Sequence, residues 1–126
     1  MNNARVLVLA DTAEVAHYLA EVLLPQAGYV ATMADDFAPP PPCDAILVDI
    51  NLMRSADPFA SLKAQRRMGS NAPAILFVPR LTEQMAVEVF PLGIRDLVLK
   101  PVEDAVRLEK LAEFVSTARE EQNQAA

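Results

Sequence analysis

Five short apolar segments recur along the chain, and none shows the strict polar–apolar alternation of a strand that faces water on one side. They cover residues 5–11, 29–33, 44–49, 74–78 and 94–99. Continuous aliphatic runs of this kind are typical of strands buried on both faces, which is how parallel sheets are built. The pattern therefore predicts five strands in one parallel sheet.

Most of these segments are separated by stretches in which apolar residues recur at helical spacing. Thr12, Asp57 and Thr82 can cap the first three helices, and Pro58 fits the first helical position after Asp57. A last helix is expected from about Glu103, followed by a polar tail over 120–126 that frays. The positions that carry the helical spacing are Val15, Leu19, Val22 and Leu23 in the first helix and Phe59, Leu62, Gln65 and Arg66 in the second. In the third helix Met85, Ala86 and Val89 are expected to face inward, and in the last helix the buried side is expected to contain Val106, Leu108, Leu111, Val115 and Ala118.

The connection between the second and third strands is unusual. It contains four consecutive prolines within residues 38–43, and proline can propagate neither a helix nor a sheet ladder. Elsewhere strands and helices alternate, which gives right-handed crossovers and a sheet covered on both faces. We expect a single α/β domain over residues 1–126: a doubly wound, five-stranded parallel sheet in the flavodoxin-like order 2-1-3-4-5, with the second helix shortened or replaced by the proline-rich loop.

Composition narrows the classes of function. The chain has 126 residues and a net charge of −6, which argues against direct binding of nucleic acid. Its one cysteine, Cys43, allows no disulfide within the chain, and no signal peptide or membrane-spanning stretch is visible. The basic residues between 63 and 67 suit a solvated helix face, and His17 suits an exposed one. These features favour a cytoplasmic protein.

Three charged residues close strand segments of the predicted sheet. Asp11 ends the first, Asp49 ends the third, and Lys100 follows the fifth directly before Pro101. The carboxyl ends of parallel strands meet at one edge, where ligands gather. Either aspartate alone can be explained as a cap of the next helix, but together the three residues predict a site.

Three sequence blocks, 5–11, 44–52 and 93–101, resemble the signature blocks of response-regulator receiver domains (CheY-like) in order and spacing. The resemblance implies phosphorylation of Asp49 by a histidine kinase or phosphotransfer protein of a bacterial two-component system. It implies Mg²⁺ bound by Asp11, Asp49 and the backbone carbonyl of Asn51, because Mg²⁺ prefers hard oxygen ligands. Lys100 would pair with Asp49 and the phosphoryl oxygens, and a cis peptide before Pro101 would aim it. The chain would be a phosphoacceptor rather than an enzyme.

The chain departs from the family pattern at several positions. Ala10 replaces the first acid of a usual pair, which should weaken Mg²⁺ binding. Val78 replaces a hydroxyl residue at the end of the fourth strand, and Leu97 replaces an aromatic residue on the fifth. Pro79 and Met53 also stand where the family usually has a small residue and a proline. The nucleophile is kept, but the usual relay of its phosphorylation is lost, so an atypical response is expected.

These departures leave a second hypothesis open: a pseudo-receiver that acts as a phosphorylation-independent interaction or dimerisation module. Either way, an effector domain, a partner protein or a second copy could bind the surface of the fourth helix, fifth strand and fifth helix. Two enzyme-like classes fit poorly. A haloacid-dehalogenase-like phosphatase expects an aspartate where this chain has Asn51, and a flavodoxin expects a Ser/Thr/Gly-rich phosphate loop after the first strand.

Overall fold

The computed structural model describes residues 3–35, 37–51 and 58–125. Its strands are β1 (Arg5–Ala10), β2 (Val30–Met33), β3 (Ala45–Asp49), β4 (Ala74–Val78) and β5 (Ile94–Leu99). Its helices are α1 (Ala13–His17), the π-helical η1 (Tyr18–Leu23), α2 (Leu24–Gln26), α3 (Ala60–Arg67), α4 (Glu83–Val89), the 3₁₀ turn η2 (Phe90–Leu92) and α5 (Asp104–Ala125). No helix in the described part of the chain is long and apolar enough to cross a membrane.

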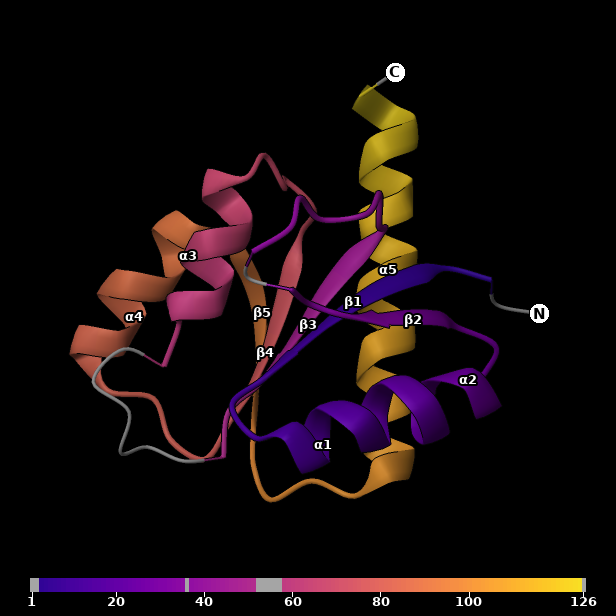
Figure 1. Ribbon diagram of the computed structural model, residues 1–126, viewed down its shortest axis with the longest axis horizontal. Helices are drawn as coiled ribbons and strands as arrows, with labels where there is room; N and C mark the ends of the chain where they lie inside the picture. The colour runs from indigo at the N-terminus through magenta and orange to yellow at the C-terminus, as the bar shows by residue number, and fades with distance from the viewer. Residues whose placement is uncertain (1–2, 36, 52–57, 126) are drawn as a thin grey trace.

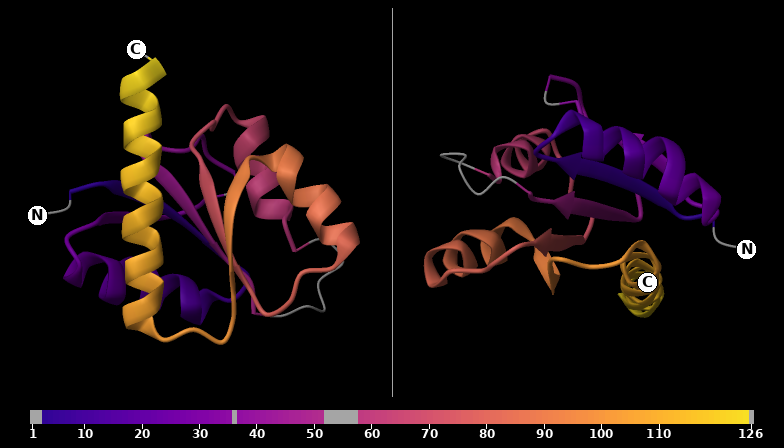
Figure 2. Two further views of the ribbon diagram at one scale, coloured as in Figure 1. Left: turned by 180° about the vertical axis from the view of Figure 1, so that it is seen from behind. Right: turned by 90° about the horizontal axis from the view of Figure 1, so that it is seen from below.

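The five strands form one sheet in the order β2-β1-β3-β4-β5, and every pair is parallel. This confirms the predicted topology. α1, η1, α2 and α5 cover one face, and α3 and α4 cover the other (Figures 1 and 2). The carboxyl ends of β1, β3 and β5 all lie at the lower edge of Figure 1, close to the start of α5. The fold therefore brings the strand-end residues to one edge.

Two apolar cores lie on the two faces of the sheet. One joins alternate residues of β1, β3 and β4 to η1, α2 and α5 through Leu19, Leu23, Leu111 and Phe114. The other joins the remaining positions of these strands to α3 and α4. Because both faces are covered, every residue of β3 and β4 is buried, as the unbroken apolar runs predicted.

The first predicted helix is continuous in space but changes type within its length. Thr12 caps it as expected, its hydroxyl accepting from the Val15 N–H at 3.3 Å. In the middle, the Leu24 N–H bonds to the Leu19 carbonyl, five residues back, which widens the turn. This shifts the buried stripe, so Leu24 is fully buried while Val22 is 42% exposed. Of the positions at helical spacing, Leu19 and Leu23 are therefore buried and Val22 is not.

Residues 38–43 contain neither helix nor strand, which confirms that the proline-rich loop replaces a helix in this connection. The start of α3 also differs from the prediction. The cap expected at Asp57 lies outside the described residues, while Pro58 lies in a turn and the helix begins at Ala60. Thr82 caps α4 as predicted, through a 3.1 Å bond from the Met85 N–H.

The last helix follows its predicted course and buries Leu111, Val115 and Ala118 as predicted. It starts at Asp104 and continues to Ala125, so the expected frayed tail from Glu120 is helical. Val106, also predicted on the buried side, is 37% exposed, and Arg107 and Phe114 are buried in addition to the predicted residues. The stripe of α5 that packs on the sheet therefore contains a charged residue, which sequence reasoning does not expect.

Candidate functional site

The centre of the candidate site is Asp49, the last residue of β3. Its side chain has no exposed surface, and its register partners are Ala10 on β1 and Phe77 on β4. Its Oδ1 accepts from the Lys100 Nζ at 2.5 Å and from the Asn51 side-chain amide at 3.2 Å. A buried carboxylate is tolerated only where charges and donors surround it, and these two side chains supply part of that environment.

Lys100 reaches Asp49 from the far side of β4. Its backbone N–H bonds to the Val78 carbonyl at 2.8 Å, which extends the β4–β5 pairing by one residue beyond β5. The following bond to Pro101 is cis, as predicted. The ammonium also donates to the Asn51 side-chain oxygen and, at 3.4 Å, to the Ile50 carbonyl. Four backbone and side-chain contacts therefore aim the lysine at the acceptor.

Asn51 links Asp49 to Asp11. Its backbone N–H lies 2.9 Å from both carboxylate oxygens of Asp11, and its side-chain nitrogen lies 3.5 Å from Asp11 Oδ1. The Asp11 N–H in turn donates to the Asp49 carbonyl at 3.3 Å. The structure thus brings together all four predicted site residues, Asp11, Asp49, Asn51 and Lys100, at one edge of the sheet.

A fifth residue completes the site, and the sequence interpretation missed it. Arg107 of α5 places a guanidinium nitrogen 3.3 Å from Asp49 Oδ2, and only 8% of the residue is exposed. Its position on α5 carried the signal. Arg107 lies four residues before Leu111 and seven before Phe114, both of which face the core. A charged residue on the apolar stripe of a helix, one turn from a candidate site, marks a side chain to examine.

The oxygen atoms at this edge have the chemistry that Mg²⁺ prefers. Asp49 Oδ2 accepts no hydrogen bond from the described residues, so it keeps free lone pairs for a cation. The charges are less favourable, because the cations Lys100 and Arg107 already lie against Asp49. Among the described residues, no three His, Cys, Asp or Glu side chains are grouped to hold a metal. The donor atoms therefore fit Mg²⁺, although two cations already lie against Asp49.

The positions where the chain departs from the family pattern are also visible. Val78 ends β4 fully buried in the core beneath α3 and α4, and its side chain has no polar atom. Leu97 on β5 is half-buried against the same core. Ala10 lies beside Asp49 and contributes only a methyl group. The side chains at these three positions therefore contain neither a hydroxyl nor an aromatic ring.

Comparisons with solved structures identify the fold. A CheY-like response regulator receiver domain protein from Methanospirillum hungatei matches with a TM-score of 0.73 and 18% identity, over 95% of this chain and 99% of that one. The fold is that of receiver domains. The non-phosphorylated HemR receiver domain from Leptospira biflexa matches at TM-score 0.68 and 20% identity, covering 90% and 95% of the two chains. The chemotaxis protein CheY4 from Vibrio cholerae matches at 0.65 and 21%, covering 89% and 98%.

No protein-family model matches the sequence, and no curated protein matches it either. The receiver fold is therefore recognised through the structure, with sequence identities of about 20%. The order of strands and the shortened connection after β2 agree with the topology inferred from the sequence.

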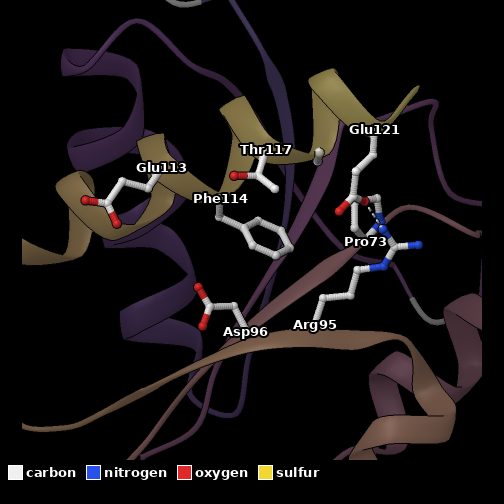
Figure 3. Close-up of a pocket in the computed structure, with 8 residues that line it drawn as sticks. Pro73, Arg95, Asp96, Glu113, Phe114, Thr117 and Glu121 are labelled. Atoms are coloured by element: carbon white, nitrogen blue, oxygen red, sulfur yellow. Dashed lines mark hydrogen bonds and ion pairs between the residues drawn. The ribbon is translucent and has the colours of Figure 1, made fainter. Parts of the chain in front are cut away.

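A separate cleft of about 230 Å³ lies between β5 and α5 (Figure 3). Pro73, Arg95, Phe114 and Glu121 are among its lining residues, and Arg95 forms an ion pair with Glu121 across it. Pro73 and Arg95 stand at the amino ends of β4 and β5, whereas Lys100 follows the carboxyl end of β5. The cleft is thus remote from the Asp49 site.

Proposed function

We propose that this chain is a signalling receiver domain that accepts a phosphoryl group on Asp49 from a histidine kinase or phosphotransfer protein, assisted by Mg²⁺, with atypical coupling to its response. The observation that carries the proposal is the contact between the Asp49 carboxylate and Lys100, in a site that also contains Asp11 and Asn51. Such a role is regulatory, and it belongs in the cytoplasm with the kinase.

The chemistry asked of Asp49 is nucleophilic. A carboxylate oxygen attacks the phosphorus of a phosphohistidine, the phosphorus–nitrogen bond breaks, and its electron pair stays on the imidazole nitrogen. The product is an acyl phosphate on Asp49. Lys100, a compact point charge, would hold the transferred oxygens, because ammonium groups bind phosphate strongly.

Mg²⁺, when bound, offsets the repulsion between the two anions that must meet. The Asp11 carboxylate, Asp49 Oδ2 and the Asn51 carbonyl are the groups that would hold it. Ala10 removes one negative charge from their surroundings, and Lys100 and Arg107 supply two positive ones. We therefore expect Mg²⁺ to bind weakly.

Partners would bind the surface formed by α4, β5 and α5. Large apolar side chains are exposed on the first two of these elements and on η2 between them: Val87 at 73%, Phe90 at 66% and Leu99 at 58%. An effector domain, a partner protein or a second copy of the chain could cover them. In receiver domains a hydroxyl residue at the end of the fourth strand helps to link phosphorylation to this surface. Since this chain has Val78 there, phosphorylation of Asp49 would have to alter the surface through other residues.

A second candidate is a receiver-like module that binds partners without phosphorylation. The observation in its favour is that Asp49 is wholly buried and already paired with Lys100 and Arg107. In this candidate the ion pairs are structural, and replacing Asp49 in folded protein leaves partner binding unchanged.

Intact-mass spectrometry after incubation with acetyl phosphate and Mg²⁺ tests the first candidate. We expect one added phosphoryl group in the wild type and in Asp44→Asn, a matched aspartate beside the other end of β3, and none in Asp49→Asn. Circular dichroism shows whether each variant is folded. Absence of phosphorylation in the wild type, or its persistence in Asp49→Asn, would refute the proposal.

A further inference from the structure

Asp49 and Arg107 are the two buried charged residues in the described part of the chain, with 0% and 8% of their surface exposed. It lies in the first turns of α5, where its N–H bonds to the Glu103 carbonyl at 2.9 Å. Its guanidinium stacks over the Phe77 ring at 5.6 Å and also lies beside Asp49. Phe77 and Asp49 are register partners on adjacent strands. Arg107 therefore spans the acceptor and its neighbour from above the sheet.

A second carboxylate holds the guanidinium in this position. Asp104 accepts from Arg107 Nη1 at 2.6 Å, and its other oxygen accepts from the Tyr18 hydroxyl at 2.5 Å. The bond to Asp104 raises the pKa of Tyr18 above its ordinary value, so the phenol stays a donor. A chain of polar contacts thus runs from Tyr18 on η1 through Asp104 and Arg107 to Asp49.

The ion pair between Arg107 and Asp49 leaves polar atoms of both side chains without a hydrogen bond. The two groups are 3.3 Å apart, yet neither Asp49 Oδ2 nor Arg107 Nε has a hydrogen-bond partner among the described residues. A buried arginine–carboxylate pair normally uses parallel hydrogen bonds. Here an acceptor and a donor are both left with unused capacity, although leaving a buried polar atom unpaired is costly. A phosphoryl oxygen on Asp49 is an acceptor that Nε could bond.

The charges of the site also favour binding of a phosphoryl group by Arg107. Lys100 and Arg107 both lie against Asp49, and Ala10 stands where a further acid would add another negative charge beside it. A phosphoryl group on Asp49 adds negative charge next to these two cations. Two fixed cations on opposite oxygens of the acceptor can then share it.

We infer that Arg107 is an anion-binding residue of the acceptor site, which clamps the phosphoryl group on Asp49 together with Lys100. The inference deepens the proposed function and rests on it. A planar guanidinium provides several directed donors, whereas Lys100 provides a point charge, so the two cations have different tasks. The plainer alternative is a structural ion pair between α5 and β3, which would leave phosphorylation unaffected in folded protein.

The test compares Arg107→Met, Arg107→Lys and Lys110→Met, the last removing a charge from the same helix one turn later. The initial rate of phosphorylation by acetyl phosphate is measured by intact mass. We expect a loss of about tenfold or more in Arg107→Met, since a hydrogen bond to a charged group is removed. Arg107→Lys should be intermediate, because it keeps the charge but not the fork, and Lys110→Met should match the wild type.

A double-mutant cycle with Asp49→Asn and Arg107→Met, measured by urea unfolding without divalent cations, tests the pairing itself. We expect the two effects on the unfolding equilibrium constant to be non-additive by about tenfold. The inference requires both results. Wild-type rates in folded Arg107→Met, or additive effects in the cycle, overturn it while leaving Asp49 as the acceptor. If the wild type itself is not phosphorylated, the proposed function fails as well.

Discussion

Replacing Asp49 by asparagine should destabilise this protein, and the reason lies in its two cations. Lys100 Nζ and Arg107 Nη2 lie 2.5 and 3.3 Å from the carboxylate, and their side chains are only 12% and 10% exposed. If Asp49 faced only other carboxylates, the same substitution would relieve repulsion and raise stability. Here it removes the anion between two buried positive charges.

The size of the effect follows from these distances. At an effective dielectric constant of about 20, each contact corresponds to roughly 5–7 kcal/mol of attraction before desolvation is subtracted. Desolvation cancels most of this, and breaking a buried pair by removing one partner typically costs about 3–5 kcal/mol. Asp104 still pairs with Arg107, and both cations keep some contact with water. We therefore expect a loss of about 2–4 kcal/mol in the free energy of unfolding.

Urea unfolding followed by circular dichroism measures this loss. The midpoint should fall with an unchanged slope, which shows that stability and not compactness has changed. Glu113→Gln is the matched control, since it removes one negative charge from an exposed position on α5. It should change stability by no more than about 0.5 kcal/mol. Equal or higher stability of Asp49→Asn would show that repulsion between Asp49 and Asp11 outweighs the pairing with the cations, and the reasoning would be refuted.

Three further predictions concern the core, the turns and the thiol. Leu111→Ala should lower the free energy of unfolding by about 2–5 kcal/mol because Leu111 has no exposed surface, whereas Val106→Ala should be nearly neutral. The reverse order in urea unfolding would contradict the face that α5 packs on the sheet. Gly93→Ala and Gly69→Ala should each lower the free energy of unfolding by about 1 kcal/mol, because both residues have positive φ. The loss should be larger for Gly93→Ala, since its Cβ would lie 2.7 Å from the Arg66 guanidinium, whereas the Cβ at position 69 would meet nothing within 4 Å. Equal losses in urea unfolding would contradict this crowding. Burial raises the pKa of the Cys43 thiol, so less thiolate is present at a given pH. Alkylation by iodoacetamide should therefore require a higher pH in the folded protein than in the urea-unfolded protein. Coincident pH profiles of the two alkylation rates would contradict the raised pKa.

Much of the fold follows from local patterns. The limits of β4 and β5 agree with the apolar runs, and the strand order follows from right-handed crossovers between parallel strands. The convergence of Asp11, Asp49 and Lys100 follows for the same reason, since residues that end parallel strands meet at one edge. These features depend on spacing along the chain, which a sequence displays directly.

The departures came from packing between distant segments. The widened turn that buries Leu24 and exposes Val22 adjusts the first helix to the sheet. The start of α3 after Pro58 also did not follow the expected capping pattern. In both places the helix propensity of the residues is a weak guide to the structure, because propensities differ by less than about 1 kcal/mol per residue and tertiary contacts outweigh them.

The sequence by itself determined that Asp49 ends a strand at one edge of the sheet, with Asp11 and Lys100 nearby. Only the tertiary structure decided what surrounds it. Arg107 stands 58 positions after Asp49, and its contact with that residue depends on how α5 is rotated over β3 and β4. That rotation is set by the combined packing of Leu111, Phe114 and Val115, not by any single residue. The charge balance of the acceptor site is therefore a property of the folded protein, since it requires partners that only the assembled core brings within a few ångströms of each other.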